Sequence, residues 1–89
     1  MITYSEINER IKDLTSEMLL LPPKTERKRY LMAEIMTLET YPEFIMKSPN
    51  AIEFFETMKK EAAERGNLNH AAGLERVIKW IKEKHHGKL

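Results

Sequence analysis

Residues 4–23 read YSEINERIKDLTSEMLLLPP, and this stretch decides the fold class. Apolar residues recur in it at intervals of three or four, and as far as Met18 they are separated by polar or charged residues; they are Tyr4, Ile7, Ile11, Leu14, Met18 and Leu21. On an α-helix this spacing gives one apolar stripe about 100° wide. Thr3 and Glu6 have the spacing of a capping box, and Pro22–Pro23 stops the pattern. The sequence therefore predicts an amphipathic helix over residues 4–21.

A second helix is predicted over residues 25–39, with Thr25 as its N-cap. The intervening proline pair predicts a tight turn, so the two helices should form an antiparallel hairpin. The apolar arc of the second helix is broad, since Met32 and Met36 extend the stripe of Leu31, Ile35 and Leu38. The first helix alone cannot cover this arc. Either the C-terminal helices or a second copy of the chain must do so, and we expect a homodimer.

Two prolines and one glycine divide the rest of the chain. The segment 41–47 is too short for a full helix and predicts a single helical turn. Ser48 and Pro49 have the order of an N-cap followed by proline at the first helical position, which predicts a helix over 49–65 ended by Gly66. A last helix is predicted over 69–85, capped by Asn67 or Asn69. The expected fold is all-α, a bundle of four helices in one domain spanning residues 1–89, with the N-terminal hairpin followed by a C-terminal helix pair.

Composition restricts the possible functions. Of the 89 residues, 42% are hydrophobic and 33% are charged, which is typical of a folded chain. The absence of cysteine excludes disulfides and thiolate zinc sites, and favours the cytoplasm. We expect no secretory signal and no membrane association, because the longest apolar run is Met18–Leu21. A net charge of +1 gives no overall attraction to nucleic acid, so such binding would need local patches.

Nothing in the sequence predicts catalysis, a cofactor or a metal site. There is no nucleophile–base set and no glycine-rich phosphate loop. His85 and His86 diverge by about 100° on a helix, so they cannot easily share one metal ion. Glu83 and His86 match the Glu-x-x-His spacing of di-iron bundles, but that site requires a second copy of the motif. Glutamates such as Glu34 are expected on solvated helix faces.

The first candidate binding patch lies at the start of the second helix. It consists of four cations within six residues: Lys24, Arg27, Lys28 and Arg29. Cations at this position oppose the positive end of the helix dipole, which costs a few tenths of a kcal/mol or more unless something compensates. The patch therefore suggests binding of an anion or an acidic partner, with solvation and Glu26 as the alternative explanation.

The second candidate patch is Trp80 with Arg76 and Lys84, each one helical turn away. Trp80 lies outside the stripe of Leu74, Ile78 and Ile81. Tryptophan and arginine dominate binding hot spots, so Trp80 is expected either to anchor a partner or to cover the edge of the core. The sequence leaves these two alternatives open.

These features predict a small non-catalytic protein that binds another protein, as an adaptor, regulator or inhibitor. Proteins of this build are common among regulatory factors and among proteins of phages and mobile elements. The alternative is a nucleic-acid-binding protein that uses the basic patches at the start of the second helix and on the C-terminal helix.

Overall fold

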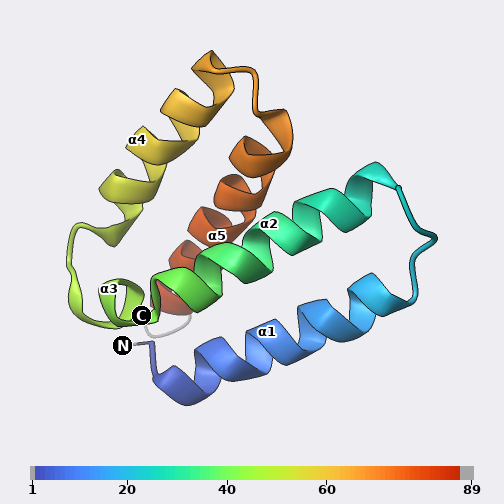
Figure 1. The fold of residues 1–89 in the computed structure, drawn as a ribbon. Helices are drawn as coiled ribbons and strands as arrows, with labels where there is room; N and C mark the ends of the chain where they lie inside the picture. The colour runs from blue at the N-terminus through green and yellow to red at the C-terminus, as the bar shows by residue number, and fades with distance from the viewer. Residues whose placement is uncertain (1, 87–89) are drawn as a thin grey trace.

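The computed structural model describes residues 2–86, and these residues form an all-α fold of five helices without a strand (Figure 1). The helices are α1 (Tyr4–Leu19), α2 (Glu26–Thr40), α3 (Pro42–Lys47), α4 (Ala51–Glu64) and α5 (Leu68–His86). The predicted all-α class is confirmed. Each of the four long helices ends within two residues of its predicted bounds, and the segment expected to be a single turn is the six-residue helix α3.

Most of the predicted helix ends are confirmed by hydrogen bonds. At the start of α1, the Glu6 amide donates to Thr3 Oγ1 at 3.1 Å and the Thr3 amide donates to Glu6 Oε1 at 2.9 Å. Thr25 caps α2, and Asn67 Oδ1 accepts from the His70 amide at 3.3 Å at the start of α5. The cap predicted for α4 is wrong. Ser48 instead accepts from the Asn50 amide in the preceding turn, and α4 begins at Ala51.

The fold consists of two helical hairpins that cross each other. α1 and α2 run antiparallel, as do α4 and α5, and α2 crosses in front of α5 in Figure 1. α2 and α4 both pack extensively against α5, but they do not pack extensively against each other. α2 and α4 therefore both lie against α5 but diverge from each other.

The broad apolar arc of α2 is divided between the core and the surface. Leu31, Ile35 and Leu38 are buried, because α1 and α5 cover α2 from two sides. Met32 and Met36 remain 47% and 60% exposed. Neighbours within the same chain thus cover most of the arc. Met32 and Met36 are the part of the arc that an additional partner could still cover.

The crossing of α2 and α5 depends on Gly73. A Cβ atom at this position would lie 2.5 Å from Ala33 Cβ and 2.9 Å from the Glu34 amide nitrogen. Carbon atoms in proteins pack at about 3.5–4.0 Å, so no side chain fits here without moving the helices apart. Glycine is unfavourable inside a helix by about 1 kcal/mol relative to alanine, and the close packing offsets this cost.

We expect Gly73→Ala to destabilise the fold despite its better helix propensity. Overpacking of a core typically costs about 1–3 kcal/mol, and for a domain of this size 1 kcal/mol corresponds to roughly 4–8 °C in Tm. Thermal unfolding followed by circular dichroism measures the change. Adding Ala33→Gly should restore part of the loss, since it removes the nearest clashing atom. An unchanged or higher Tm for Gly73→Ala alone would show that the crossing is not tightly packed.

Candidate functional site

A groove lies between α2, α4 and the start of α5, and we call it the α2–α4 groove. Its volume is about 350 Å³. Its lining combines an apolar set with a smaller number of polar side chains; the residues are Arg29, Met32, Ala33, Met36, Thr37, Thr40, Tyr41, Met58, Asn67, Asn69 and His70. Ligand-binding clefts commonly have this size and this mixture of apolar walls and a few polar groups.

One wall of the groove is a single face of α2. The lining residues of α2 from Arg29 to Thr40 recur every three or four positions, which places them on one helical stripe. This stripe covers three turns, or about 16 Å at 1.5 Å per residue. The hydroxyl groups of Thr37 and Thr40 donate to the carbonyls of Ala33 and Met36 at 2.8 and 2.6 Å, so they are already satisfied within α2. The exposed centre of this wall is therefore the pair Met32 and Met36.

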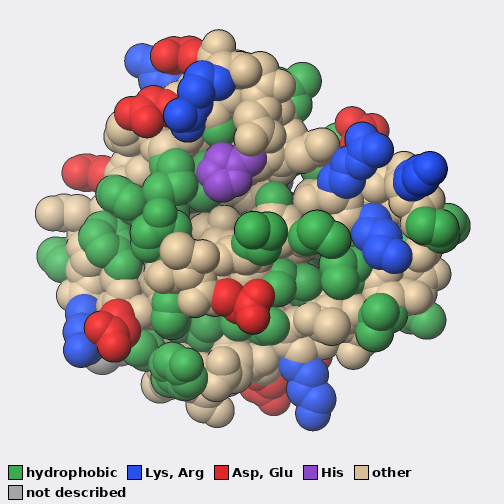
Figure 2. All heavy atoms as spheres, in the orientation of Figure 1, with side chains coloured by type: hydrophobic (Ala, Val, Ile, Leu, Met, Phe, Trp, Pro, Cys, Tyr) green, Lys and Arg blue, Asp and Glu red, His purple; other side chains and the backbone are tan. Residues whose placement is uncertain are grey.

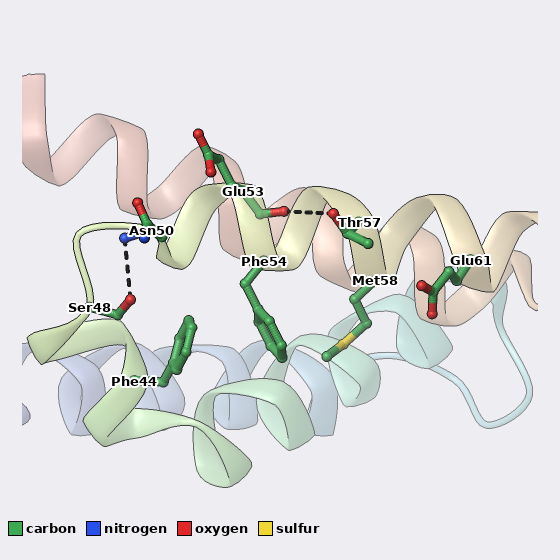
Figure 3. A pocket seen from close by; sticks show the side chains of 8 residues that line it. All are labelled: Phe44, Ser48, Asn50, Glu53, Phe54, Thr57, Met58 and Glu61. Atoms are coloured by element: carbon green, nitrogen blue, oxygen red, sulfur yellow. Dashed lines mark hydrogen bonds between the residues drawn. The ribbon is translucent and has the colours of Figure 1, made fainter.

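A second hollow of about 550 Å³ continues from the groove along α3 and α4 (Figure 3). Met58 lines both spaces. Phe54 and Met58 point from α4 toward the side on which Phe44 of α3 lies, and the Phe44 and Phe54 rings are 4.6 Å apart between centroids. Five of the eight residues lining the hollow are polar, including Glu53 and Glu61. The hollow is thus the more polar and more acidic continuation of the α2–α4 groove.

The surface view is consistent with a mainly apolar face. Figure 2 shows hydrophobic side chains spread across this face over α2, α3 and α4. Basic side chains gather at the edge where α2 begins. The α2–α4 groove therefore has a cationic border at one end.

The predicted basic patch at the start of α2 forms that border, but its four cations are not equivalent. Arg27 pairs with Glu17 of α1 at 2.5 Å, and this hydrogen-bonded guanidinium lowers the pKa of the Glu17 carboxyl. Lys24 lies in the turn with φ of 68°, a conformation that favours glycine. Among the residues that the structure describes, Lys24, Lys28 and Arg29 form no ion pair. Only Arg29 of this patch lines the groove.

The residues of the second predicted patch contact other residues of the same chain. Trp80 is only 6% exposed and belongs to the main hydrophobic core, which favours the second of the two alternatives that the sequence left open. Lys84 Nζ lies 5.9 Å from the Trp80 ring centroid and 3.2 Å from Glu6 Oε2 of α1. Arg76 is bonded to Glu34. The structure thus places Trp80 at the core, while a role of these residues in partner binding stays an untested prediction.

Sequence reasoning also misplaced Glu34, which is completely buried rather than solvated. Its Oε2 accepts from Arg10 Nε at 3.0 Å, and its Oε1 accepts from Arg76 Nε at 2.6 Å. Charge-assisted bonds to two arginines compensate for the desolvation of this carboxylate. The Arg10–Glu34–Arg76 cluster therefore ties α1, α2 and α5 together at a single point.

Among residues 2–86, no group of three or more histidine, aspartate or glutamate side chains is arranged to hold a metal ion. No helix in this range is long and apolar enough to cross a bilayer. The side chain of His86, one of the two residues of the Glu-x-x-His match, lies outside the described structure.

Comparison with protein-family models, with curated proteins and with solved structures found no match for this chain. The functional conclusion consequently depends on the geometry of the chain itself. Within that geometry, the α2–α4 groove combines exposed methionines, an open apolar wall and an unpaired cation. Sequence reasoning identified these methionines and this cation separately, but it did not place them in one site.

Proposed function

We propose that this protein is a small non-catalytic protein-binding factor of the cytoplasm, an adaptor, regulator or inhibitor, whose α2–α4 groove binds a helical segment of another protein. The observation that carries the proposal is the exposure of Met32 and Met36 on the wall of an open groove. Large apolar side chains that line a concave surface mark binding sites more often than isolated exposed ones do.

A helix is the segment whose dimensions suit this groove. A partner helix of three turns would run the length of the α2 wall and present apolar side chains at positions i, i+3 or i+4, and i+7. Methionine suits such a site because its unbranched, polarizable side chain adapts to differently shaped partners. Three of the six methionines of the chain line the groove, namely Met32, Met36 and Met58.

We expect Met32→Gln/Met36→Gln to weaken helix binding by at least about tenfold. Glutamine keeps the length and helix propensity of methionine, but its amide would be desolvated without a partner, at about 1–3 kcal/mol per side chain. The probe is a phage-displayed library of helical peptides of about 16 residues, a length at which isolated helices become viable. Peptides selected on the wild-type protein should carry apolar residues at helical spacing, and their affinities are then measured for both proteins.

The matched control is Leu19→Gln/Leu20→Gln, since these leucines are 72% and 86% exposed outside the groove. This control should leave the affinity unchanged. Selected peptides that bind the methionine double variant as tightly as the wild type would refute the groove as the binding site. Failure to select any peptide with helical spacing would count against the proposed function itself.

The alternative function is nucleic-acid binding through the unpaired cations Lys24, Lys28 and Arg29. On α5, the cations Arg76, Lys82 and Lys84 are already held in ion pairs within the chain, so we rank this function second. A salt titration separates the two functions. Binding to phosphates weakens steeply as salt rises, whereas binding in an apolar groove responds little.

A homodimer is the competing proposal for the same surface, because a second copy of the chain would cover the exposed Met32 and Met36. Light scattering coupled to gel filtration at tens of micromolar gives the mass directly. A mass near that of one 10.5 kDa chain would exclude a stable homodimer.

A further inference from the structure

Arg29 differs from the other arginines near the core. Arg10 and Arg76 are bonded to Glu34, and Arg27 is bonded to Glu17. Of the arginines within residues 2–86, only Arg29 and Arg65 form no ion pair, and of these two only Arg29 lines the α2–α4 groove. Its side chain is exposed, on the first turn of α2. The guanidinium is therefore free to bind a group brought in by a partner.

Arg29 also places a positive charge near the positive end of the α2 helix dipole. A cation in the first turn is disfavoured by the helix dipole. Glu26 is the acid of this turn, but within residues 2–86 Arg29 forms no ion pair with a carboxylate, whereas Arg27 does. The helix dipole consequently does not favour a cation at this position in the free chain. A bound carboxylate would supply the missing compensation.

We propose that Arg29 is the specificity-determining residue of the groove, and that the bound segment is an acidic amphipathic helix with a carboxylate at the end that meets the start of α2. This inference rests on the proposed function and specifies the chemistry of the partner. The planar guanidinium can donate two parallel hydrogen bonds to one carboxylate, which fixes both the charge and the orientation of the ligand.

The opposite end of the binding surface has the opposite charge. The hollow that continues the groove past Met58 carries Glu53 and Glu61 on its lining. A carboxylate of the partner would be repelled there and attracted at Arg29. Charge complementarity therefore selects one direction for the helix, with its acidic end beside Arg29.

The experiment compares peptide selections on three proteins: the wild type, Arg29→Glu and Arg65→Glu. Arg65 is the matched control, because it is exposed and unpaired but lies outside the groove. The probe is the phage-displayed helical library, followed by synthesis of one enriched peptide and of its variant in which lysine replaces the terminal acidic residue. Circular dichroism of each protein verifies that the fold is retained.

Wild-type and Arg65→Glu proteins should enrich helices with glutamate or aspartate at one end of the apolar stripe. Arg29→Glu should bind the acidic peptide about tenfold or more weakly, since hydrogen bonds to charged groups contribute at least this factor, and should prefer the lysine peptide. Enriched helices without an acidic preference, or an equal loss in Arg65→Glu, would overturn the role of Arg29 while leaving the groove in place. Selection of no helical peptide at all would instead contradict the proposed function.

A second copy of the chain is a competing occupant of the groove, and the same proteins test it. If the wild type self-associates at tens of micromolar and Met32→Gln/Met36→Gln is monomeric, then the groove is a self-association site and the acidic-helix inference is wrong. A wild type that stays monomeric in light scattering while it binds the acidic peptide supports the inference.

Discussion

Glu34→Gln is expected to be among the most destabilising single substitutions in this protein. The Glu34 carboxylate has 0% exposure and forms ion pairs with two arginines, whose own side chains are 29% and 30% exposed. Breaking a buried ion pair typically costs about 3–5 kcal/mol, and the partial exposure of the arginines favours the lower end of this range. A loss of about 3 kcal/mol corresponds to a decrease in Tm of roughly 12–24 °C for a domain of this size. Urea and thermal unfolding measure the change.

Glu39→Gln is the matched control for this prediction, because Glu39 lies on the same helix and is exposed. It should change Tm by no more than a few degrees. Simultaneous replacement of the cluster, Arg10→Met/Glu34→Leu/Arg76→Met, should recover much of the stability, since apolar side chains of similar size often replace buried ion pairs without loss. Equal Tm values for Glu34→Gln and Glu39→Gln would show that the cluster contributes nothing.

Trp80→Ala should unfold the protein at a markedly lower temperature. Trp80 is 6% exposed within the core, and truncation of a buried aromatic residue to alanine costs about 3–5 kcal/mol through lost burial and the cavity left behind. Its contact with Lys84 adds a cation–π interaction at 5.9 Å between Nζ and the ring centroid. Circular dichroism is the appropriate probe, because Trp80 is the only tryptophan and its removal abolishes the fluorescence signal.

Trp80→Phe provides the graded control and should lose clearly less stability than Trp80→Ala. The alternative account of Trp80, an interface anchor, makes the opposite prediction. It requires Trp80→Ala to weaken partner binding by about 2 kcal/mol while leaving Tm nearly unchanged. That result would return Trp80 to the binding surface and would contradict its assignment to the core.

Local sequence signals predicted the helices well, because apolar periodicity and capping act between residues close in the chain. The capping box of Thr3 and Glu6 and the left-handed Gly66, with φ of 79°, are confirmed on this basis. Ser48–Pro49 failed as a helix start because Ser48 is used in a turn instead. No local pattern explains the glycine at position 73. It is required because α2 approaches closely at Ala33, which is forty residues away in the sequence.

The burial of Glu34 and the burial of Trp80, both of which lie beside the apolar stripes, have a common physical cause. The apolar stripes read from the sequence include neither residue, whereas α2 and α5 have neighbours on more than one side. Glu34 can be buried only because Arg10 and Arg76 reach it from positions 24 and 42 residues away. The groove likewise depends on the way α2 and α4 diverge from each other, and helical periodicity does not predict this arrangement. The sequence did single out Met32 and Met36 as the extension of a broad apolar arc, and Arg29 as one of four clustered cations, because apolar pattern and charge are local properties.

The most direct test of the central claim is a methyl NMR titration of protein labelled with ¹³C at the methionine methyl groups, using the acidic helical peptide selected on the wild type. Met32, Met36 and Met58 line the groove, whereas Met18 and Met46 pack against the core elsewhere and serve as internal references. Binding in the groove predicts large, saturable shifts for the first three signals and little change for the two references. Saturable binding that shifts Met18 or Met46 while leaving Met32, Met36 and Met58 unchanged would contradict the α2–α4 groove as the functional site.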